Sequence, residues 1–271
     1  MKMIFDAHTH TYPEILSYRA TSNLGAFYSF RVKEVGTVDG LIETSREAGV
    51  SGFLILGVAT NARQVRRVNE AIAADIMKAR ECGFRAYGYA SMHQDTADFA
   101  AELDYAESLG LTGVKLHPDI QGVAIDDERL FPLYEQLSRR DLPVCLHMGD
   151  DRPEYRYSEP KKLARVLDMF PELTVIASHL GGYRAWDEAA EYLAGRKNVV
   201  FGASSVLWTM TPDAALRQIH MLGVENIMFG SDYPVISSAD YLSLFDRLSL
   251  TEDELRAIMW DNAARFFKFN D

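Results

Sequence analysis

The chain has 271 residues, of which 48% are hydrophobic and 25% charged, enough to build a substantial core in one α/β barrel or in two small domains. Its net charge of −11 opposes binding to a phosphate backbone. The chain contains no apolar run of the roughly 18 residues that a membrane span needs. We therefore expect a small-molecule substrate and no nucleic-acid or membrane partner, and we leave a homodimer open. Cys82 and Cys145 lie far apart and the N-terminus lacks an apolar signal region, a pattern typical of a cytoplasmic protein.

An apolar start leads into Asp6-Ala-His8-Thr-His10. On a strand, alternate side chains share a face, so His8 and His10 would project together and could bind one metal ion. Asp6 would share that face, either as an acceptor that orients a ligand or as a structural residue. Two imidazoles leave a divalent ion under-coordinated, so the remaining ligands must come from later in the chain.

Residues 11–36 are rich in aromatic side chains and show no clear period of about 2 or about 3.6 residues. This pattern predicts a long irregular loop after the first strand. Loops longer than about 15 residues inside a compact domain are more often lids or binding loops than plain connections. We therefore predict an active-site lid over residues 11–36.

From residue 38 onward, helical segments alternate with apolar, strand-like segments. The expected strands cover 52–58, 84–90, 113–117, 143–147, 173–179, 198–203 and 226–232, and the expected helices cover 38–48, 62–81, 96–108, 127–140, 159–170, 184–194, 212–222 and 239–247, with a last helix after Thr251. With the first strand this gives eight strand–helix units. Strands that are apolar on both faces suit a parallel sheet covered by helices. We predict a single domain over 1–271 folded as a (β/α)8 TIM barrel; the main alternative, an open doubly wound sheet, lacks a G-x-G-x-x-G turn.

The carboxyl ends of the strands of such a barrel form one rim, where active sites lie. The residues expected there are His8, His10, Lys115, His117, His147, His179 and Asp232. Imidazoles and a carboxylate suit Zn²⁺, and also Mn²⁺, Fe²⁺ or Co²⁺. A metal ion would lower the pKa of a bound water from about 15.7 towards about 7. Asp232 could then bind the metal and accept a proton, while His179 polarises the substrate.

Six motifs spread along the chain support a family resemblance. They are Asp6-Ala-His8-Thr-His10, Gly113-Val-Lys-Leu-His-Pro118, Leu142-Pro-Val-Cys-Leu-His147, Ser178-His-Leu-Gly-Gly182, Phe229-Gly-Ser-Asp-Tyr-Pro234 and Asn262-Ala-Ala-Arg-Phe266. In these the chain resembles the amidohydrolase superfamily, in particular the "amidohydrolase 2" branch that contains aminocarboxymuconate semialdehyde decarboxylase. The resemblance implies one metal held by His8, His10, His147 and Asp232, with His179 as an acid/base group. Branches with two metals use a carbamylated lysine, for which Lys115 is placed, and His147 and His179 would then hold the second ion. We expect one ion, zinc before other divalent metals.

Several further side chains could contact a substrate. His117 lies two residues beyond Lys115 and either faces the substrate or anchors a loop. Arg31, Arg152 and Arg184 could each bind a carboxylate, and Trp208 could form a pocket wall. For each arginine a surface role is the competing interpretation, and for the tryptophan it is ordinary packing.

These features lead to one main functional hypothesis and two alternatives. The main one is a metal-dependent hydrolase that cleaves a C–N or C–O bond of a small amide, lactone or cyclic amide through metal-activated water. The alternative is a metal-dependent, non-oxidative decarboxylase of a small unsaturated or aromatic carboxylic acid; arginines converging on the pocket would favour it. A non-catalytic metal-binding scaffold is the third, and it leaves the reactive rim residues unexplained.

Overall fold

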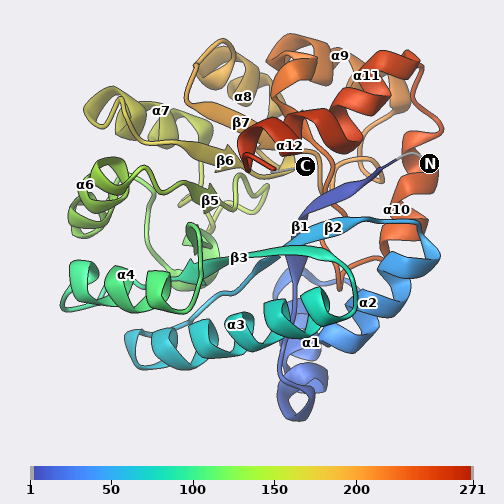
Figure 1. Cartoon of the computed structure of the whole chain (residues 1–271). Helices are drawn as coiled ribbons and strands as arrows, with labels where there is room; N and C mark the ends of the chain where they lie inside the picture. Colours follow the sequence, from blue (N-terminus) through green and yellow to red (C-terminus); the bar gives the residue numbers. More distant parts are fainter. Residues whose placement is uncertain (1–2, 270–271) are drawn as a thin grey trace.

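Eight parallel strands surround one axis in the computed structural model, which describes residues 3–269 (Figure 1). The strands are β1 (Phe5–His10), β2 (Gly52–Leu56), β3 (Arg85–Ser91), β4 (Val114–Leu116), β5 (Val144–Leu146), β6 (Val175–Ala177), β7 (Val199–Gly202) and β8 (Ile227–Met228). Each pairs in parallel with the next one in sequence. The Ala7 amide donates to the Phe229 carbonyl at 2.8 Å and the His10 amide to the Tyr233 carbonyl at 2.7 Å, which joins β1 to the segment after β8. The predicted (β/α)8 TIM barrel is confirmed.

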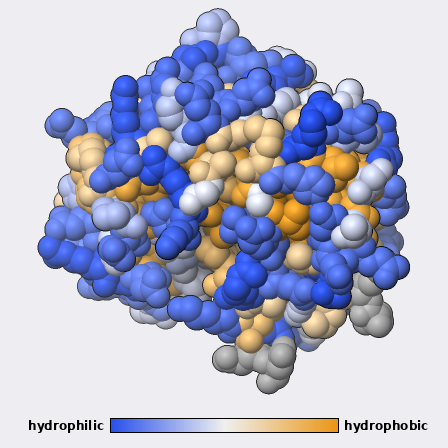
Figure 2. All heavy atoms as spheres, turned by 90° about the horizontal axis from the view of Figure 1, so that it is seen from above, coloured by the Kyte–Doolittle hydropathy of each residue, from blue (hydrophilic) through white to orange (hydrophobic). Residues whose placement is uncertain are grey.

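The outer helices lie where the hydrophobic pattern predicts them. They are α2 (Val38–Glu47), α3 (Val65–Glu81), α4 (Phe99–Ser108), α6 (Phe131–Arg140), α7 (Pro160–Met169), α8 (Trp186–Leu193), α9 (Pro212–Leu222) and α10 (Ser238–Phe245), followed by α11 (Glu252–Arg256) and α12 (Asn262–Phe266). Thr251 and Glu254 form a capping box at the start of α11. Seen from above the view of Figure 1, hydrophilic side chains surround smaller hydrophobic areas (Figure 2). No helix within residues 3–269 has the length and apolar character that crossing a bilayer requires.

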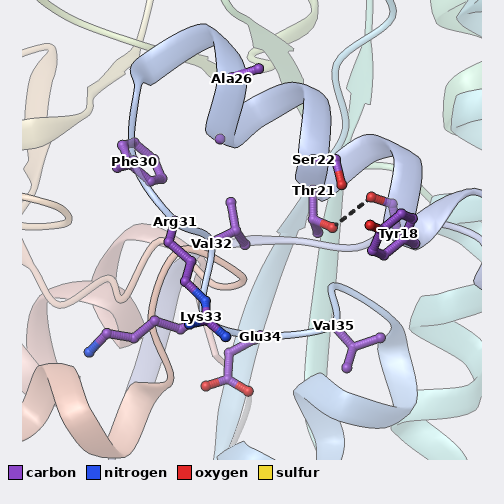
Figure 3. A pocket seen from close by; sticks show the side chains of 11 residues that line it. Tyr18, Thr21, Ser22, Ala26, Phe30, Arg31, Val32, Lys33, Glu34 and Val35 are labelled. Carbon is purple, nitrogen blue, oxygen red and sulfur yellow. Dashed lines mark hydrogen bonds between the residues drawn. The ribbon is translucent and has the colours of Figure 1, made fainter.

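Residues 11–36 differ from the expected irregular loop, because they contain the helix α1 (Glu14–Tyr28), which projects at the bottom of Figure 1. The prediction of an irregular backbone was wrong because α1 has no apolar stripe to produce a period. Its buried residues are Ser17 and Thr21, while Ile15 is 92% exposed and Tyr18 84% exposed. A cavity of about 690 Å³ lies between α1 and residues 30–35 (Figure 3). The lid role of 11–36 stays a prediction.

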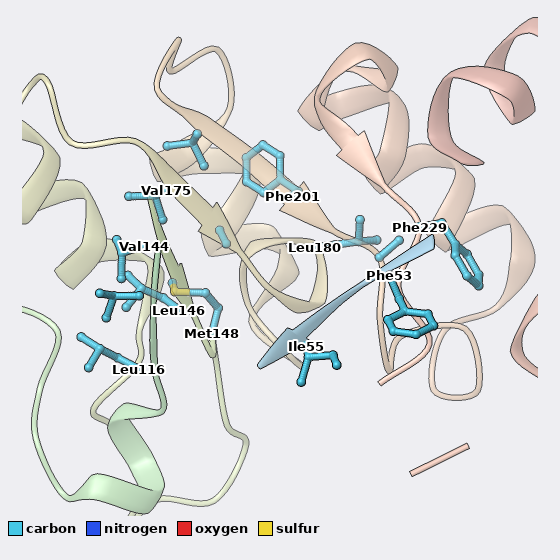
Figure 4. Packing of buried hydrophobic residues seen from close by; sticks show 14 of the residues in the cluster. Phe53, Ile55, Leu116, Val144, Leu146, Met148, Val175, Leu180, Phe201 and Phe229 are labelled. Atoms are coloured by element: carbon cyan, nitrogen blue, oxygen red, sulfur yellow. The ribbon is translucent and has the colours of Figure 1, made fainter. Parts of the chain in front are cut away.

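Alternate residues of the strands pack on opposite sides of the barrel wall. Leu54 and Leu56 lie in the barrel interior, in a cluster that also holds Cys145. Phe53 and Ile55 belong to the larger cluster between the sheet and the helices (Figure 4). Because the interior is filled with apolar side chains, the polar residues collect at the carboxyl ends of the strands, the rim at which active sites of this architecture form.

Candidate active site

Three of the predicted metal ligands converge at the rim. The Nε2 atoms of His8 and His10 lie 3.1 Å apart. Oδ1 of Asp232 lies 3.4 Å from the Nε2 atom of His8 and 3.6 Å from that of His10. A divalent ion with bonds of about 2.0–2.2 Å places neighbouring ligand atoms about 3–3.6 Å apart. The donor set therefore has both the chemistry and the spacing of a metal site.

The histidines of this group are held in the form that binds a metal. Burial and the nearby charge of Lys115 lower the pKa of His8 well below its ordinary value and that of His10 to about 4, so both rings are neutral at pH 7. His10 Nδ1 lies 2.9 Å from the Leu56 carbonyl, which can only accept, so this nitrogen carries the hydrogen. The Nε2 atom of His10 then presents its lone pair to the centre of the group.

The strand that carries His8 and His10 does not alternate regularly. The register of β1 against β2 shifts between Asp6 and Thr9. Asp6 consequently points away from the two histidines, against our expectation that it would share their face. Its Oδ1 atom accepts the amides of His8 at 3.2 Å and of Ser231 at 2.9 Å.

These contacts favour the structural interpretation of Asp6, because its partners are backbone amides and a serine and not a histidine ring. The hydroxyl of Ser238 donates to Oδ2 of Asp6 at 2.9 Å, so the carboxylate joins β1 to two points after β8. Burial raises the pKa of Asp6 to about 6 although these hydrogen bonds oppose the shift. By fixing Ser231, the residue before Asp232, Asp6 aligns the two segments that carry the predicted ligands His8, His10 and Asp232.

Backbone geometry brings Asp232 against β1. Its amide donates to the His8 carbonyl at 2.9 Å, and its φ of +68° lies in the left-handed region that a residue with a Cβ atom rarely adopts. A Cβ atom on Gly230 would lie 2.8 Å from the Cβ atom of His8, so glycine permits this approach. The hydroxyl of Ser205 donates to Oδ2 of Asp232, which leaves Oδ1 directed to the histidines.

A second polar group lies at the ends of β4 and β5. It consists of His117, Asp119 and His147, whose ligand atoms all lie within 4.8 Å of one another. The rings of His117 and His147 stack with centroids 3.9 Å apart. Asp119 is buried, accepts the Ser158 hydroxyl at 2.5 Å, and has its pKa raised to about 6 by burial. His117 thus faces the site rather than serving only as a loop anchor.

Asp119 was not among the predicted site residues. The signal for it was a carboxylate two residues after the histidine that follows β4, a position directly beyond a strand end. The short helix α5 (Pro118–Gln121) turns the chain there and places Asp119 beside His147.

His179 links the two groups. Its Nε2 atom lies 2.9 Å from Nδ1 of His147, and its Nδ1 atom lies 3.0 Å from the Ser204 carbonyl. The Ser204 hydroxyl is also 3.2 Å from Nδ1 of His8. Burial lowers the pKa of His179, so this ring too is neutral at pH 7. His147 belongs to the second group and not to the first, so its role as a fourth ligand to the ion at His8 remains a prediction.

Lys115 lies at the base of the site with its side chain fully buried. Its Nζ atom donates to Cys145 Sγ at 3.7 Å. Its positive charge contributes to lowering the pKa of both His117 and His147, after the larger effect of burial. The rim therefore keeps neutral histidines around a buried cation, and carbamylation of Lys115, which belongs to the two-metal alternative, stays untested.

The three arginines and the tryptophan predicted as substrate contacts either lie away from the rim histidines or form contacts with other residues. Arg31 is exposed and lines the outer cavity of Figure 3. Arg184 lies 3.2 Å from Asp151 and is nearly half exposed. Trp208 is 39% exposed and packs on Tyr241. Arg152 donates to both carboxylate oxygens of Asp150 at 2.8 and 2.6 Å. The converging arginines that would have signalled a carboxylate-binding cluster are thus not formed.

An unpredicted residue, Tyr28 at the end of α1, completes the site. Its hydroxyl lies 2.8 Å from Nε2 of His117 and 3.3 Å from Nε2 of His147. Burial, together with the negative charges of Asp119 and Asp232, raises the pKa of Tyr28 well above its ordinary value. The sequence marked its segment as aromatic, but nothing distinguished Tyr28 from the neighbouring aromatic residues.

Two curated relatives are decarboxylases. The chain is 24% identical over 284 residues to "Decarboxylase orsB" of Emericella nidulans, covering 85% of each chain. It is 23% identical over 255 residues to the gamma-resorcylate decarboxylase of a Polaromonas species, covering 76% of each. These relatives correct our main expectation of hydrolysis and favour the decarboxylase alternative.

Solved structures share the fold at low sequence identity. An uncharacterised TIM-barrel protein from Bordetella bronchiseptica matches with a TM-score of 0.80, 22% identity and 98% coverage of each chain. The 5-carboxyvanillate decarboxylase LigW of Sphingomonas paucimobilis matches with a TM-score of 0.76, 18% identity and full coverage of both. A dihydroxybenzoic acid decarboxylase of Polaromonas, solved with manganese and the inhibitor 2-nitroresorcinol, matches with a TM-score of 0.72, 17% identity, and 100% and 98% coverage.

The Amidohydro_2 family model, described as "Amidohydrolase", matches residues 5–269. This match spans β1 and the segment after β8, the two parts of the chain that supply His8, His10 and Asp232. The resemblance inferred from the six motifs is thereby confirmed. The chain belongs to the Amidohydro_2 family of the metal-dependent amidohydrolase superfamily.

Proposed function

We propose that the chain is a metal-dependent, non-oxidative decarboxylase of a small hydroxylated aromatic carboxylic acid. The observation that carries the proposal is the convergence of neutral His8 and His10 with the Asp232 carboxylate, within 3.6 Å of one another, in a chain whose curated relatives are decarboxylases. Substrate hydroxyl and carboxylate oxygens are suitable ligands for a metal held by such residues.

The metal proposed for this site is a divalent ion, with manganese favoured over the zinc that we first expected. A structural neighbour contains manganese, and nitrogen and carboxylate ligands serve either ion. His8, His10 and Asp232 would hold the ion, and His147 is the proposed fourth ligand. When bound, it would supply positive charge that stabilises the electron-rich ring as CO₂ leaves.

The reaction breaks the bond between the ring and the carboxylate carbon. CO₂ leaves, the electron pair stays on the ring carbon, and one proton must be delivered to that carbon. Asp232 and His179 are the ionisable groups proposed to hold this proton, at a carboxylate oxygen and at Nε2 respectively. His117 and Asp119 form the opposite polar wall and would orient the substrate by hydrogen bonds.

The test is CO₂ release from 2,6-dihydroxybenzoate and related hydroxybenzoates by protein stripped with a chelator and reloaded with Mn²⁺ or Zn²⁺. We expect turnover by the reloaded protein and its loss in Asp232→Asn. His220→Asn is the matched control, because His220 lies on the surface and pairs with Glu254 at 2.8 Å, away from the rim. Absence of CO₂ release from every hydroxybenzoate by folded, metal-loaded protein would overturn the proposal.

A further inference from the structure

We propose that Tyr28 is a substrate-contacting residue that α1 brings to the site, and that Arg152 positions it. The inference rests on the proposed function and deepens it, because it assigns recognition of the aromatic acid to a helix outside the barrel. Tyr28 would donate a hydrogen bond to an anionic oxygen of the substrate. Arg152 would act through Tyr28 and would not bind the carboxylate itself.

The hydrogen-bond directions around Tyr28 leave its O–H available. The amide of Ile120 donates to Nδ1 of His117 at 3.3 Å, so in the neutral ring the hydrogen is on Nε2. That Nε2–H donates to the Tyr28 oxygen at 2.8 Å. The Tyr28 O–H can then point to Nε2 of His147, 3.3 Å away.

This second contact is long, and its acceptor has another neighbour. His147 Nε2 also lies 3.2 Å from the Gly149 carbonyl, which can only accept, so a hydrogen on this nitrogen would donate there and would leave no lone pair for the Tyr28 O–H. A carboxylate or phenolate oxygen is a stronger acceptor than a neutral imidazole. A hydroxylated aromatic acid entering between the two polar groups would therefore replace His147 as the partner of the Tyr28 hydroxyl. The ring of Tyr28 would then lie at the mouth of the site.

Little in α1 itself fixes the position of Tyr28. The buried residues of this helix are Ser17 and Thr21, whose small side chains give weak apolar anchoring to the barrel. Two of its large apolar side chains, Ile15 and Tyr18, face solvent. An element with so few buried apolar contacts opens at low free-energy cost. The end of α1 near Tyr28 must therefore be held by another contact.

Arg152 supplies that contact. Its guanidinium donates to the Phe27 carbonyl at 2.5 Å and lies over the rings of Phe27, Tyr28 and Tyr155 at 4.5, 5.1 and 4.0 Å from their centroids. Cations over aromatic faces at these distances are attracted to them. The two bonds to Asp150 fix the guanidinium plane from the other side. Arg152 thus couples the loop after β5, which follows His147, to the last turn of α1.

The test compares Tyr28→Phe, Arg152→Met and the double variant in the metal-loaded protein. Two readouts are used: kcat and KM for 2,6-dihydroxybenzoate, and the affinity for 2-nitroresorcinol by calorimetry, which needs no turnover. Tyr28→Phe is expected to weaken 2-nitroresorcinol about 10- to 100-fold, as for loss of a hydrogen bond to a charged group. Tyr105→Phe, which loses a surface hydroxyl paired with Glu70, is the matched control.

Arg152→Met should weaken the same ligand about 10-fold and should speed tryptic cleavage after the exposed residues Arg19 and Arg31. Arg129→Met, which removes a surface arginine paired with Asp127, controls for loss of charge. Because Arg152 acts through Tyr28, the double variant should bind 2-nitroresorcinol no more weakly than the single variant that has the lower affinity for it. Unchanged affinity in Tyr28→Phe, or additive losses in the double variant, would overturn the inference. Failure of the proposed function differs, because wild-type protein would then release no CO₂.

Discussion

Replacement of Asp6 separates its structural role from any part in metal chemistry. Its carboxylate accepts three hydrogen bonds, from the amides of His8 and Ser231 and from the hydroxyl of Ser238. Asp6→Ala leaves these buried donors without an acceptor, and each lost partner costs about 1–3 kcal/mol. We expect a loss of at least about 3 kcal/mol in the free energy of unfolding.

Asp6→Asn is the conservative comparison. Its amide oxygen can still accept both backbone amides, and its NH₂ group can donate to Ser238 once that hydroxyl rotates. We expect the free energy of unfolding at pH 7 to be equal to or higher than in wild type, because the variant buries no charge. Urea unfolding of the metal-free proteins measures both variants.

The pH dependence gives an independent check. Burial raises the pKa of Asp6 from 3.8 to about 6, so the folded state binds a proton more tightly than the unfolded state does. The bound proton stabilises the folded state fully below about pH 4, and this contribution is lost as the pH rises to about 6. The free energy of unfolding changes by up to about 3 kcal/mol over this range. Asp6→Asn should lack this component relative to wild type. Equal stability of Asp6→Ala and Asp6→Asn, or identical pH profiles of wild type and Asp6→Asn, would refute the reasoning.

Three further predictions address the metal-ligand group. Mn²⁺ at about 100 times its Kd should stabilise the chelator-treated protein by about 2.7 kcal/mol, raising Tm by several degrees, and the rise should vanish in His10→Ala. Asp232→Asn should lower kcat/KM at least about 100-fold and weaken Mn²⁺ binding in calorimetry, and wild-type values in both assays would contradict its assignment. Gly230→Ala should cost about 1–3 kcal/mol and weaken Mn²⁺ binding, because the new Cβ atom would lie 2.8 Å from that of His8. Gly202→Ala is the control, because its new Cβ atom would have an ordinary contact at 3.7 Å, and it should leave stability and Mn²⁺ binding unchanged.

The barrel could be predicted because its pattern repeats. Most strands are short and largely apolar, and from β2 onward the strands alternate with helices that bury apolar residues, so errors at single boundaries do not change the order of elements. The site residues of the strand ends follow from that order. His8 and Asp232 are far apart in the sequence, yet both had to lie at the rim once eight parallel strands were recognised.

The predictions from the sequence failed where the local backbone geometry departs from that of a regular strand or an amphipathic helix. The shift in register after Asp6 turns its carboxylate to the segment beyond β8, and a strict alternation of side chains cannot anticipate such an irregularity. Helix α1 escaped prediction because its buried face consists of Ser17 and Thr21 instead of an apolar stripe. Asp119 lies in the short helix α5, and its side chain is held by Ser158, which is distant in sequence.

The same distinction explains why the ligand residues did not decide between hydrolysis and decarboxylation. His8, His10 and Asp232 would hold a metal in either reaction, and their positions are set by the barrel. What differs is the group that meets the organic part of the substrate, and the group proposed for this contact is Tyr28, against whose ring Arg152 of the loop after β5 packs. Residues on such segments are placed by contacts between distant parts of the chain, so their role emerges only in three dimensions. Within this site, the choice of substrate should therefore respond to changes in α1 and in the loop after β5, whereas changes at the strand ends should remove metal binding and activity together.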